Sequence, residues 1–127
     1  MKLLLDTHTF LWSISGQKLS QNAQDAFLDA NNELFLSAVS YWEICIKQSI
    51  GKLGLAANWV QVFDQEMQFN HIQWLPIEKS HCQKIGELPF LHGDPFDRLL
   101  ITQAMVEEMT LLTADSNIHQ YPISALW

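Results

Sequence analysis

Cysteine is scarce in this sequence of 127 residues, and its two copies, Cys45 and Cys82, form no Cys-x-x-Cys pair. This excludes the usual ligand spacing of a structural zinc site and gives no sign of a disulfide framework. Cys45 lies in an apolar run, so we expect a buried thiol, although a disulfide between the two cysteines remains open. The expected environment is the reducing cytoplasm.

Long apolar runs are missing too. The first run, residues 3–5, stops at Asp6 and is far shorter than the apolar core of a signal peptide. No other segment approaches the roughly 20 apolar residues that a membrane helix needs. We therefore expect neither a signal peptide nor a membrane partner.

Basic residues are also few: seven Lys and Arg stand against 14 Asp and Glu, for a net charge of −7. Proteins that bind nucleic acid regardless of its sequence usually carry clustered basic residues. The charge therefore argues against simple clamping of phosphates. It does not argue against a metal-dependent nuclease, because the active site of such an enzyme is itself acidic.

The rest of the composition is that of one globular domain spanning residues 1–127. Apolar residues make up 48% and charged residues 17%, and the chain is long enough to form its own core. Five Trp and seven Phe provide large aromatic surfaces, part of which we expect to contact a partner.

Short apolar runs alternate with helical patterns along the chain. Strands are expected at residues 2–5, 33–36, 72–76 and 110–113, with an edge strand at 123–127. Helices are expected at residues 7–16, 20–31, 37–51, 58–70, 78–85 and 94–109, and a turn or short helix at 117–121. This alternation predicts an α/β sandwich of three layers, with a central, mainly parallel sheet of four to five strands between helices.

Acidic side chains stand where these strands end or where helices begin. Asp6 and Asp115 follow strands, Asp97 lies in the first turn of a helix capped by Asp94, and Glu43 lies early in its helix. Because the carboxyl ends of parallel strands meet at one edge of a sheet, we expect these carboxylates to converge there.

Each acid also has a purely structural explanation. The helix dipole favours acids such as Asp94 and Asp97 near a helix N-terminus, and Asp6 would cap the helix that follows it. Ser40 and Glu43 fit a Ser-x-x-Glu capping box. The prediction of a site therefore rests on the common placement of the acids.

The neighbouring basic residues have two interpretations. Lys47, Lys52 and Arg98 would each lie on a solvated helix face, with Lys47 paired to the acid four residues before it, or would contact RNA phosphates. His8 and His92 flank the predicted site, where we expect simple polar contacts rather than metal ligation.

Clustered carboxylates favour a divalent cation, because unpaired they would repel and raise one another's pKa. Oxygen ligands without thiolates or paired histidines suit Mg²⁺ or Mn²⁺ rather than zinc. Such a site is suited to hydrolysing phosphodiesters, because the metal lowers the pKa of a bound water and stabilises charge on the phosphate oxygens. The hydroxyl of Thr113 would hold a ligand carboxylate or a metal-bound water.

Four segments, in this order, resemble motifs of the PIN domain family, specifically of VapC-like ribonuclease toxins from type II toxin–antitoxin pairs. They are LLLDTH at residues 3–8, SAVSYWEI at 37–44, DPFDRLLI at 94–101 and LLTAD at 111–115. The resemblance implies a Mg²⁺- or Mn²⁺-dependent endoribonuclease with the ligands Asp6, Glu43, Asp97 and Asp115. It ranks Asp94 behind these four, as a cap or supporting acid. It also implies a PIN-like fold, an RNA substrate, a homodimer and an antitoxin whose tail covers the acidic groove.

Other assignments fit less well. A haloacid-dehalogenase-like enzyme needs a second Asp two residues after Asp6, where His8 stands, and a receiver domain needs a late Lys, but no Lys or Arg follows Arg98. A stand-alone PIN-type RNA-processing nuclease and a non-catalytic PIN-fold binding domain remain as alternatives. The full set of four acids counts against the second of these.

Overall fold

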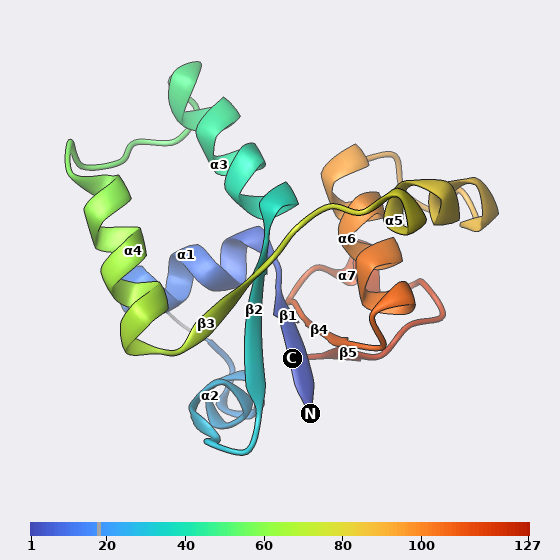
Figure 1. Cartoon of the computed structure of the whole chain (residues 1–127), viewed down its shortest axis with the longest axis horizontal. Helices are drawn as coiled ribbons and strands as arrows, with labels where there is room; N and C mark the ends of the chain where they lie inside the picture. Colours follow the sequence, from blue (N-terminus) through green and yellow to red (C-terminus); the bar gives the residue numbers. More distant parts are fainter. Residues whose placement is uncertain (18) are drawn as a thin grey trace.

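The computed structural model describes residues 1–17 and 19–127, and a five-stranded sheet lies at its centre (Figure 1). The strand order is β3-β2-β1-β4-β5, and all four pairs are parallel. The strands are β1 Lys2–Leu5, β2 Glu33–Ser37, β3 Ile72–Leu75, β4 Thr110–Leu112 and β5 Ala125–Leu126. The predicted parallel α/β architecture is confirmed, with a last strand shorter than the expected 123–127.

The central strand is β1, and its sequence explains this place. Leu3, Leu4 and Leu5 are fully buried, and Leu4 lies opposite Phe35 of β2 on one side and Leu111 of β4 on the other. A parallel strand covered on both faces needs an uninterrupted apolar run rather than alternation. The polar residue that ends this run therefore emerges at the carboxyl edge of the sheet.

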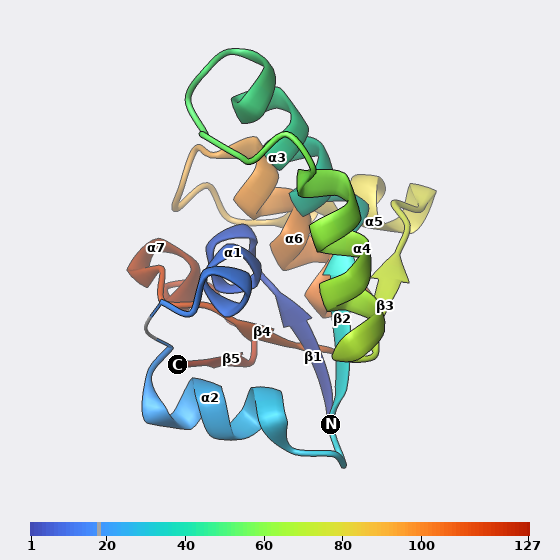
Figure 2. The ribbon, with the colours of Figure 1, turned by 90° about the vertical axis from the view of Figure 1, so that its left-hand side faces the viewer.

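Helices cover both faces of the sheet (Figures 1 and 2). They are α1 Thr7–Ser15, α2 Gln21–Leu28, α3 Ala38–Ser49, α4 Trp59–Phe69, α5 Lys79–Lys84, α6 Pro95–Val106 and α7 Ser116–His119, with a 3₁₀ turn at Ile85–Glu87. α1, α2 and α4 pack on one face, and α6 and α7 on the other. α3 rises beyond the end of β2 and contributes to both cores (Figure 1).

Alternate leucines of β1 anchor these two cores. Leu4 packs in the core that contains Leu100 of α6, whereas Leu5 packs in the core that contains Phe10 of α1 and Phe63 of α4. Successive strand residues point to opposite faces, so one short apolar strand fixes the helices of both layers.

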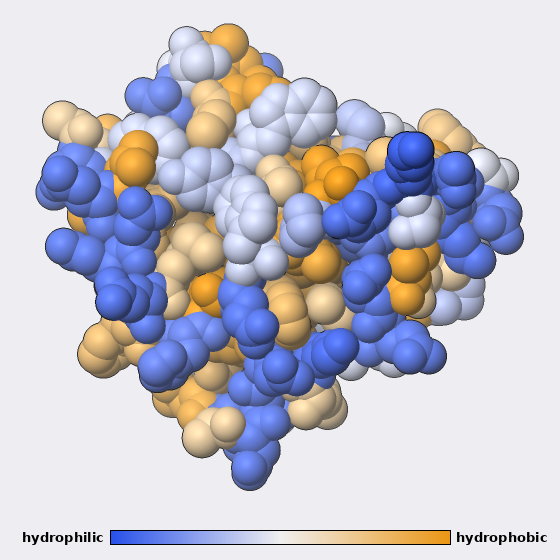
Figure 3. Space-filling model, viewed as in Figure 1, coloured by the Kyte–Doolittle hydropathy of each residue, from blue (hydrophilic) through white to orange (hydrophobic). Residues whose placement is uncertain are grey.

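Large apolar groups recur at helical spacing along α4, and most of them pack within the chain. Phe63 is buried, and Trp59 and Met67 pack against the same core. Val60 is instead 46% exposed. The large apolar groups of α4 are therefore mostly committed to the protein's own core. Seen from the side of Figure 1, the remaining apolar surface lies in small patches between hydrophilic ones (Figure 3).

Both cysteines are free thiols in the described part of the chain. Cys45 is half-buried rather than fully buried, which corrects our expectation, and no disulfide joins it to the exposed Cys82. Among the described residues, no helix has both the length and the apolar character required to cross a bilayer.

Candidate metal centre

Asp6 and Asp115 emerge side by side at the carboxyl edge, just beyond the adjacent strands β1 and β4. Each also caps a helix: Asp6 Oδ1 accepts a hydrogen bond from the Thr9 amide at 2.8 Å, and Asp115 Oδ1 accepts one from the Asn117 amide at 2.9 Å. A cap occupies only one carboxylate oxygen of each side chain. Capping and ligation are therefore compatible at both positions.

Thr113 connects the two strands' carboxylates. Its hydroxyl donates to Asp6 Oδ2 at 2.5 Å and accepts from the Asp115 amide at 3.0 Å, and the side chain is fully buried. The predicted contact between Thr113 and a carboxylate is thus present. Because the hydroxyl uses its proton on Asp6, this bond fixes the direction in which that carboxylate faces.

Glu43 is held in the same way from α1. Its Oε1 accepts from the Thr7 hydroxyl at 2.6 Å and its Oε2 pairs with Lys47 Nζ at 2.7 Å, while only 4% of the residue is exposed. The pairing of Glu43 with Lys47 matches one of our two interpretations of that lysine. Thr7 was missed by the sequence argument, because its partner lies 36 residues away.

The capping box that we expected at Ser40 is wrong. α3 begins at Ala38, and its N-cap is Ser37, whose hydroxyl accepts from the Val39 amide at 3.0 Å. Ser40 lies inside the helix, and its buried hydroxyl oxygen has no hydrogen-bond partner among the described residues. Glu43 consequently lies in the second turn, and capping does not account for it.

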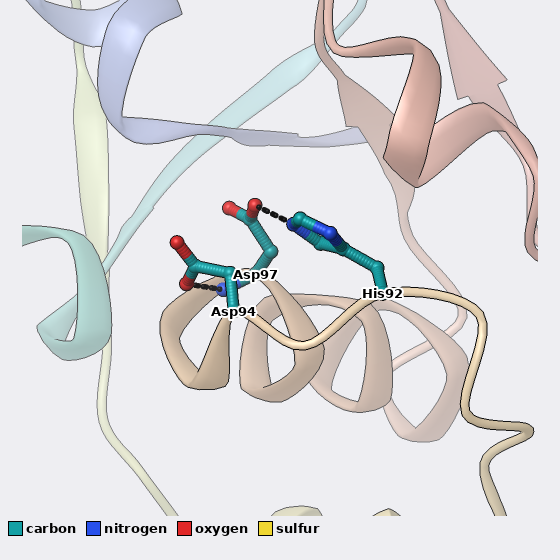
Figure 4. Close-up of side chains that lie close together, drawn as sticks. All are labelled: His92, Asp94 and Asp97. Carbon is teal, nitrogen blue, oxygen red and sulfur yellow. Dashed lines mark hydrogen bonds and ion pairs between the residues drawn. The ribbon is translucent and has the colours of Figure 1, made fainter.

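The start of α6 supplies the third group of side chains. Asp94 Oδ1 caps the helix, accepting from the amides of Phe96 at 2.8 Å and Asp97 at 3.1 Å. Asp97 Oδ2 lies 2.9 Å from His92 Nε2 (Figure 4). One ligand atom from each of His92, Asp94 and Asp97 lies within 4.8 Å of the other two. Within residues 1–17 and 19–127, no other trio of His, Cys, Asp or Glu meets this limit.

Electrostatics nevertheless couple this trio to the other acids. Burial is the main cause that raises the pKa of Asp97 from 3.8 to about 6, and the charge of Asp94 raises it further. The hydrogen bond from His92 lowers this pKa, while the charges of Asp115 and Glu43 raise it. The convergence of all four predicted acids on one cation remains a prediction, but the charges of Glu43 and Asp115 already act on the Asp97 carboxyl.

The nearest cation is insufficient to balance these charges. The hydrogen bond to Glu43 is the main cause that raises the pKa of Lys47; burial opposes the rise, and the charges of Glu43, Asp94 and Asp97 add to it. One ammonium group thus faces several carboxylates. A set of hard oxygen donors with unbalanced negative charge fits Mg²⁺ or Mn²⁺.

The model of the PIN domain family matches residues 3–123. This chain belongs to the PIN domain family. Ribonuclease VapC22 of Mycobacterium tuberculosis is 30% identical over 127 residues, which cover 94% of this chain and 93% of that protein. The chain is therefore a VapC-type PIN domain, as the four motifs implied.

Solved structures share the fold of this PIN domain over nearly its whole length. VapBC2 from Rickettsia felis, bound to a DNA fragment from its promoter, has a TM-score of 0.78 at 18% identity, over 99% of this chain and 98% of that one. DNA-bound VapBC from Salmonella typhimurium has a TM-score of 0.70 at 14% identity, over 99% and 97%. At these identities the likeness establishes the fold alone.

Arg98 of the PIN domain is neither on a solvated face nor free for RNA, which corrects both interpretations. Only 8% of it is exposed, and its Nη1 donates to the carbonyl oxygen of Pro89 at 3.2 Å and to the Tyr121 hydroxyl at 3.2 Å. The guanidinium also lies over the Phe90 ring, 4.8 Å from its centroid. Arg98 therefore holds the loop at residues 89–92 onto the domain.

Tyr121 holds the same loop from the other end of the sequence. Its hydroxyl accepts from the amides of Leu91 at 3.2 Å and His92 at 2.9 Å. These bonds fix the backbone from which the His92 ring reaches Asp97 (Figure 4). Arg98 and Tyr121 thus position His92, and through it one of the predicted ligands.

We expect Tyr121→Phe to loosen this loop, because the Leu91 and His92 amides and the Arg98 guanidinium lose a shared partner. The loss should be about 1–2 kcal/mol, expressed as faster hydrogen exchange of those amides rather than global unfolding. Tyr41→Phe is the matched control, because its hydroxyl makes none of these contacts. Unchanged exchange at Leu91 and His92 in Tyr121→Phe would contradict the assignment.

Proposed function

We propose that this VapC-family ribonuclease toxin of a VapBC pair is a Mg²⁺- or Mn²⁺-dependent endonuclease that hydrolyses RNA phosphodiester bonds. Asp6, Glu43, Asp97 and Asp115 are the proposed ligands, supported by Asp94 and Thr113. The observation that carries the proposal is the gathering of acids around the half-buried Asp97: burial raises its pKa, and so do Asp94 at the start of the same helix and Asp115 and Glu43 from two other elements. Burying charge in this way is unfavourable unless a cation compensates it.

The bound cation would activate a water and stabilise the negative charge that develops on the phosphate oxygens. The chain's own residues prepare the site for it. Thr113 and Thr7 fix the orientations of the Asp6 and Glu43 carboxylates, and His92 fixes that of Asp97. The second oxygen of Asp6 accepts from the Thr9 amide and that of Glu43 from Lys47, so a cation would bind at the remaining lone pairs. The carboxylates are therefore oriented before any ligand arrives, which lowers the cost of binding.

A non-catalytic domain would not need this arrangement. The buried Glu43 and the half-buried Asp97 lie in a chain whose net charge is already −7, and an apolar or amide side chain at position 97 would remove the repulsion on that carboxyl. Retaining charges that oppose folding is typical of a functional site.

An antitoxin is the proposed protein partner. The solved neighbours of the fold are VapBC assemblies, and family membership supports a partner of this kind here. The acidic edge favours an antitoxin segment that presents Arg or Lys to the carboxylates in place of the cation.

A homodimer is also proposed, and its proposed interface lies on α3 and α6 rather than on α4, whose large apolar groups mostly pack within the chain. Trp42 of α3 is 56% exposed and its ring lies 5.3 Å from that of Phe96 on α6, each one residue before a proposed ligand. Aromatic groups exposed beside a functional site are typical of an interface. A second copy packed on this pair would cover them and border the acidic edge.

We expect Trp42→Ala to shift the protein from dimer to monomer in light scattering at tens of micromolar, because it removes the largest exposed ring of this face. Phe69→Ala is the control, since that side chain is 81% exposed at the far end of α4. A wild-type protein that stays monomeric at high micromolar concentration would contradict the homodimer.

We expect Mg²⁺ or Mn²⁺ to be required for cleavage of RNA, and Asp97→Asn to reduce the rate at least about 100-fold, because it removes a ligand charge. EDTA should abolish cleavage and added Mn²⁺ restore it. Asp64→Asn, at an exposed position of α4, is the matched control and should cleave normally. Full activity in EDTA, or in Asp97→Asn, would refute the proposed function.

The same variant should change stability in a pH-dependent way. A folded pKa of about 6 against an ordinary 3.8 means that ionised Asp97 opposes folding, with a penalty that appears above pH 4, grows to pH 6 and then stays constant. Since the side chain is partly exposed, we expect about 1–2 kcal/mol at pH 7.5. Asp97→Asn should remove this penalty.

Urea unfolding of the metal-free protein measures this effect. The stability gain of Asp97→Asn over wild type should be larger at pH 7.5 than at pH 5, and Asp64→Asn should show no such difference. If Asp97 served mainly the helix dipole, the variant would instead lose about 0.5–1 kcal/mol at pH 7.5.

A further inference from the structure

A cavity of about 710 Å³ opens directly beside the candidate metal centre. Its walls come from α1, the end of α3, the following loop and α4, which lie together in Figure 2. Thr7 and Lys47 line this cavity, and both contact the Glu43 carboxylate. The cavity therefore adjoins the acidic edge at Glu43, separated from it by the side chains of Thr7 and Lys47.

The charge of the cavity is opposite to that of the metal centre. Lys47 and Lys52 line it, and no Asp or Glu is among its described lining residues. This is unusual for a chain with only seven basic residues and a net charge of −7. Arg98 is committed to its own loop and Lys47 to the Glu43 carboxylate, whereas the Lys52 side chain makes no ion pair within the described residues.

One wall of the cavity carries aromatic rings. His8 is exposed, and its ring lies 5.8 Å from that of Trp12, with the planes tilted by 41°. Trp12 is in turn supported by Trp127, at 5.8 Å between ring centroids. A supported ring at the wall of an open cavity offers a surface on which a nucleobase stacks.

We propose that this cavity is a subsite for a nucleotide of the single-stranded RNA substrate, next to the phosphodiester that is cut. Lys52 meets the backbone phosphate, and Trp12 with His8 stacks on the base. The volume lies within the range of small-ligand sites, and an unpaired nucleotide enters such a cavity where a duplex does not. This proposal rests on the proposed function, since it names where that substrate binds.

Charge distinguishes RNA from the antitoxin as the occupant. A basic antitoxin segment suits the carboxylates of the metal centre, but Lys52 would repel it in the cavity. An RNA strand suits both places, because its reacting phosphate would bind at the metal centre and the next phosphate would contact Lys52.

Binding of a fluorescein-labelled, single-stranded RNA octamer to full-length Asp6→Asn protein with Mg²⁺ tests this directly. Lys52→Ala should weaken binding several-fold and reduce the slope of log Kd against log salt by about 1. Trp12→Leu should weaken it about 5- to 100-fold. Lys79→Ala and Trp74→Leu, at exposed positions that do not line the cavity, should bind like the parent.

Octamers with one abasic nucleotide locate the stacked base. Removing that base should abolish the difference between Trp12→Leu and its parent, whereas removing any other base should leave the difference intact. In wild-type background, Lys52→Ala should raise KM for the octamer with kcat little changed. Thermal melts of every variant separate these effects from a loss of folding.

The outcomes distinguish this inference from the function it rests on. If Lys52→Ala and Trp12→Leu bind RNA like the two controls while wild-type protein cleaves, the subsite is wrong and the nuclease stands. If these variants lose affinity only for the antitoxin, the cavity is an antitoxin site and the inference is overturned. If wild-type protein cleaves no RNA with Mg²⁺ or Mn²⁺, the proposed function itself fails.

Discussion

Repulsion between carboxylates at one edge of a parallel sheet is the constraint on which the rest of this structure depends. The domain does not remove the repulsion. It orients the charges instead: the Thr9 amide and Thr113 hold Asp6, Thr7 and Lys47 hold Glu43, and His92 holds Asp97. The two threonine hydroxyls and the amide supply direction without cancelling the charge, and each carboxylate oxygen has a further lone pair for a cation.

Such an edge needs rigid backing, and the most buried parts of the fold provide it. β1 is paired on both sides and buried on both faces, so Asp6 leaves a strand that has little freedom to move. α6 is anchored in the core by Leu100 and Ile101, and Arg98 of the same helix fastens the loop that carries His92. The buried guanidinium of Arg98 thus donates hydrogen bonds to the carbonyl oxygens of Pro89 and His92 rather than to the carboxylates nearby.

Local patterns were sufficient for the architecture and for the places of the acids. Short apolar runs ending in Asp predict strands with a carboxylate at the edge, and Asp94 with a following proline predicts the start of α6. Contacts between distant segments were not predictable. Arg98 was misplaced because its partner Tyr121 lies 23 residues later, and Thr7 was missed because its partner Glu43 lies 36 residues away. No periodicity in a sequence encodes which hydroxyl meets which guanidinium.

Net charge is a poor description of this domain, because two surfaces of opposite sign adjoin at Glu43. Its carboxylate faces the other acids, while Lys47, which pairs with it, lines the neighbouring cavity. Under the proposed function, an RNA strand has a phosphate that would suit the basic cavity and a phosphodiester that would bind at the cation, so it would gain from both surfaces at once. A basic protein segment gains only from the acidic one. The boundary at Glu43 therefore gives the two partners overlapping but unequal footprints, and competition between them needs to occur only at the metal centre.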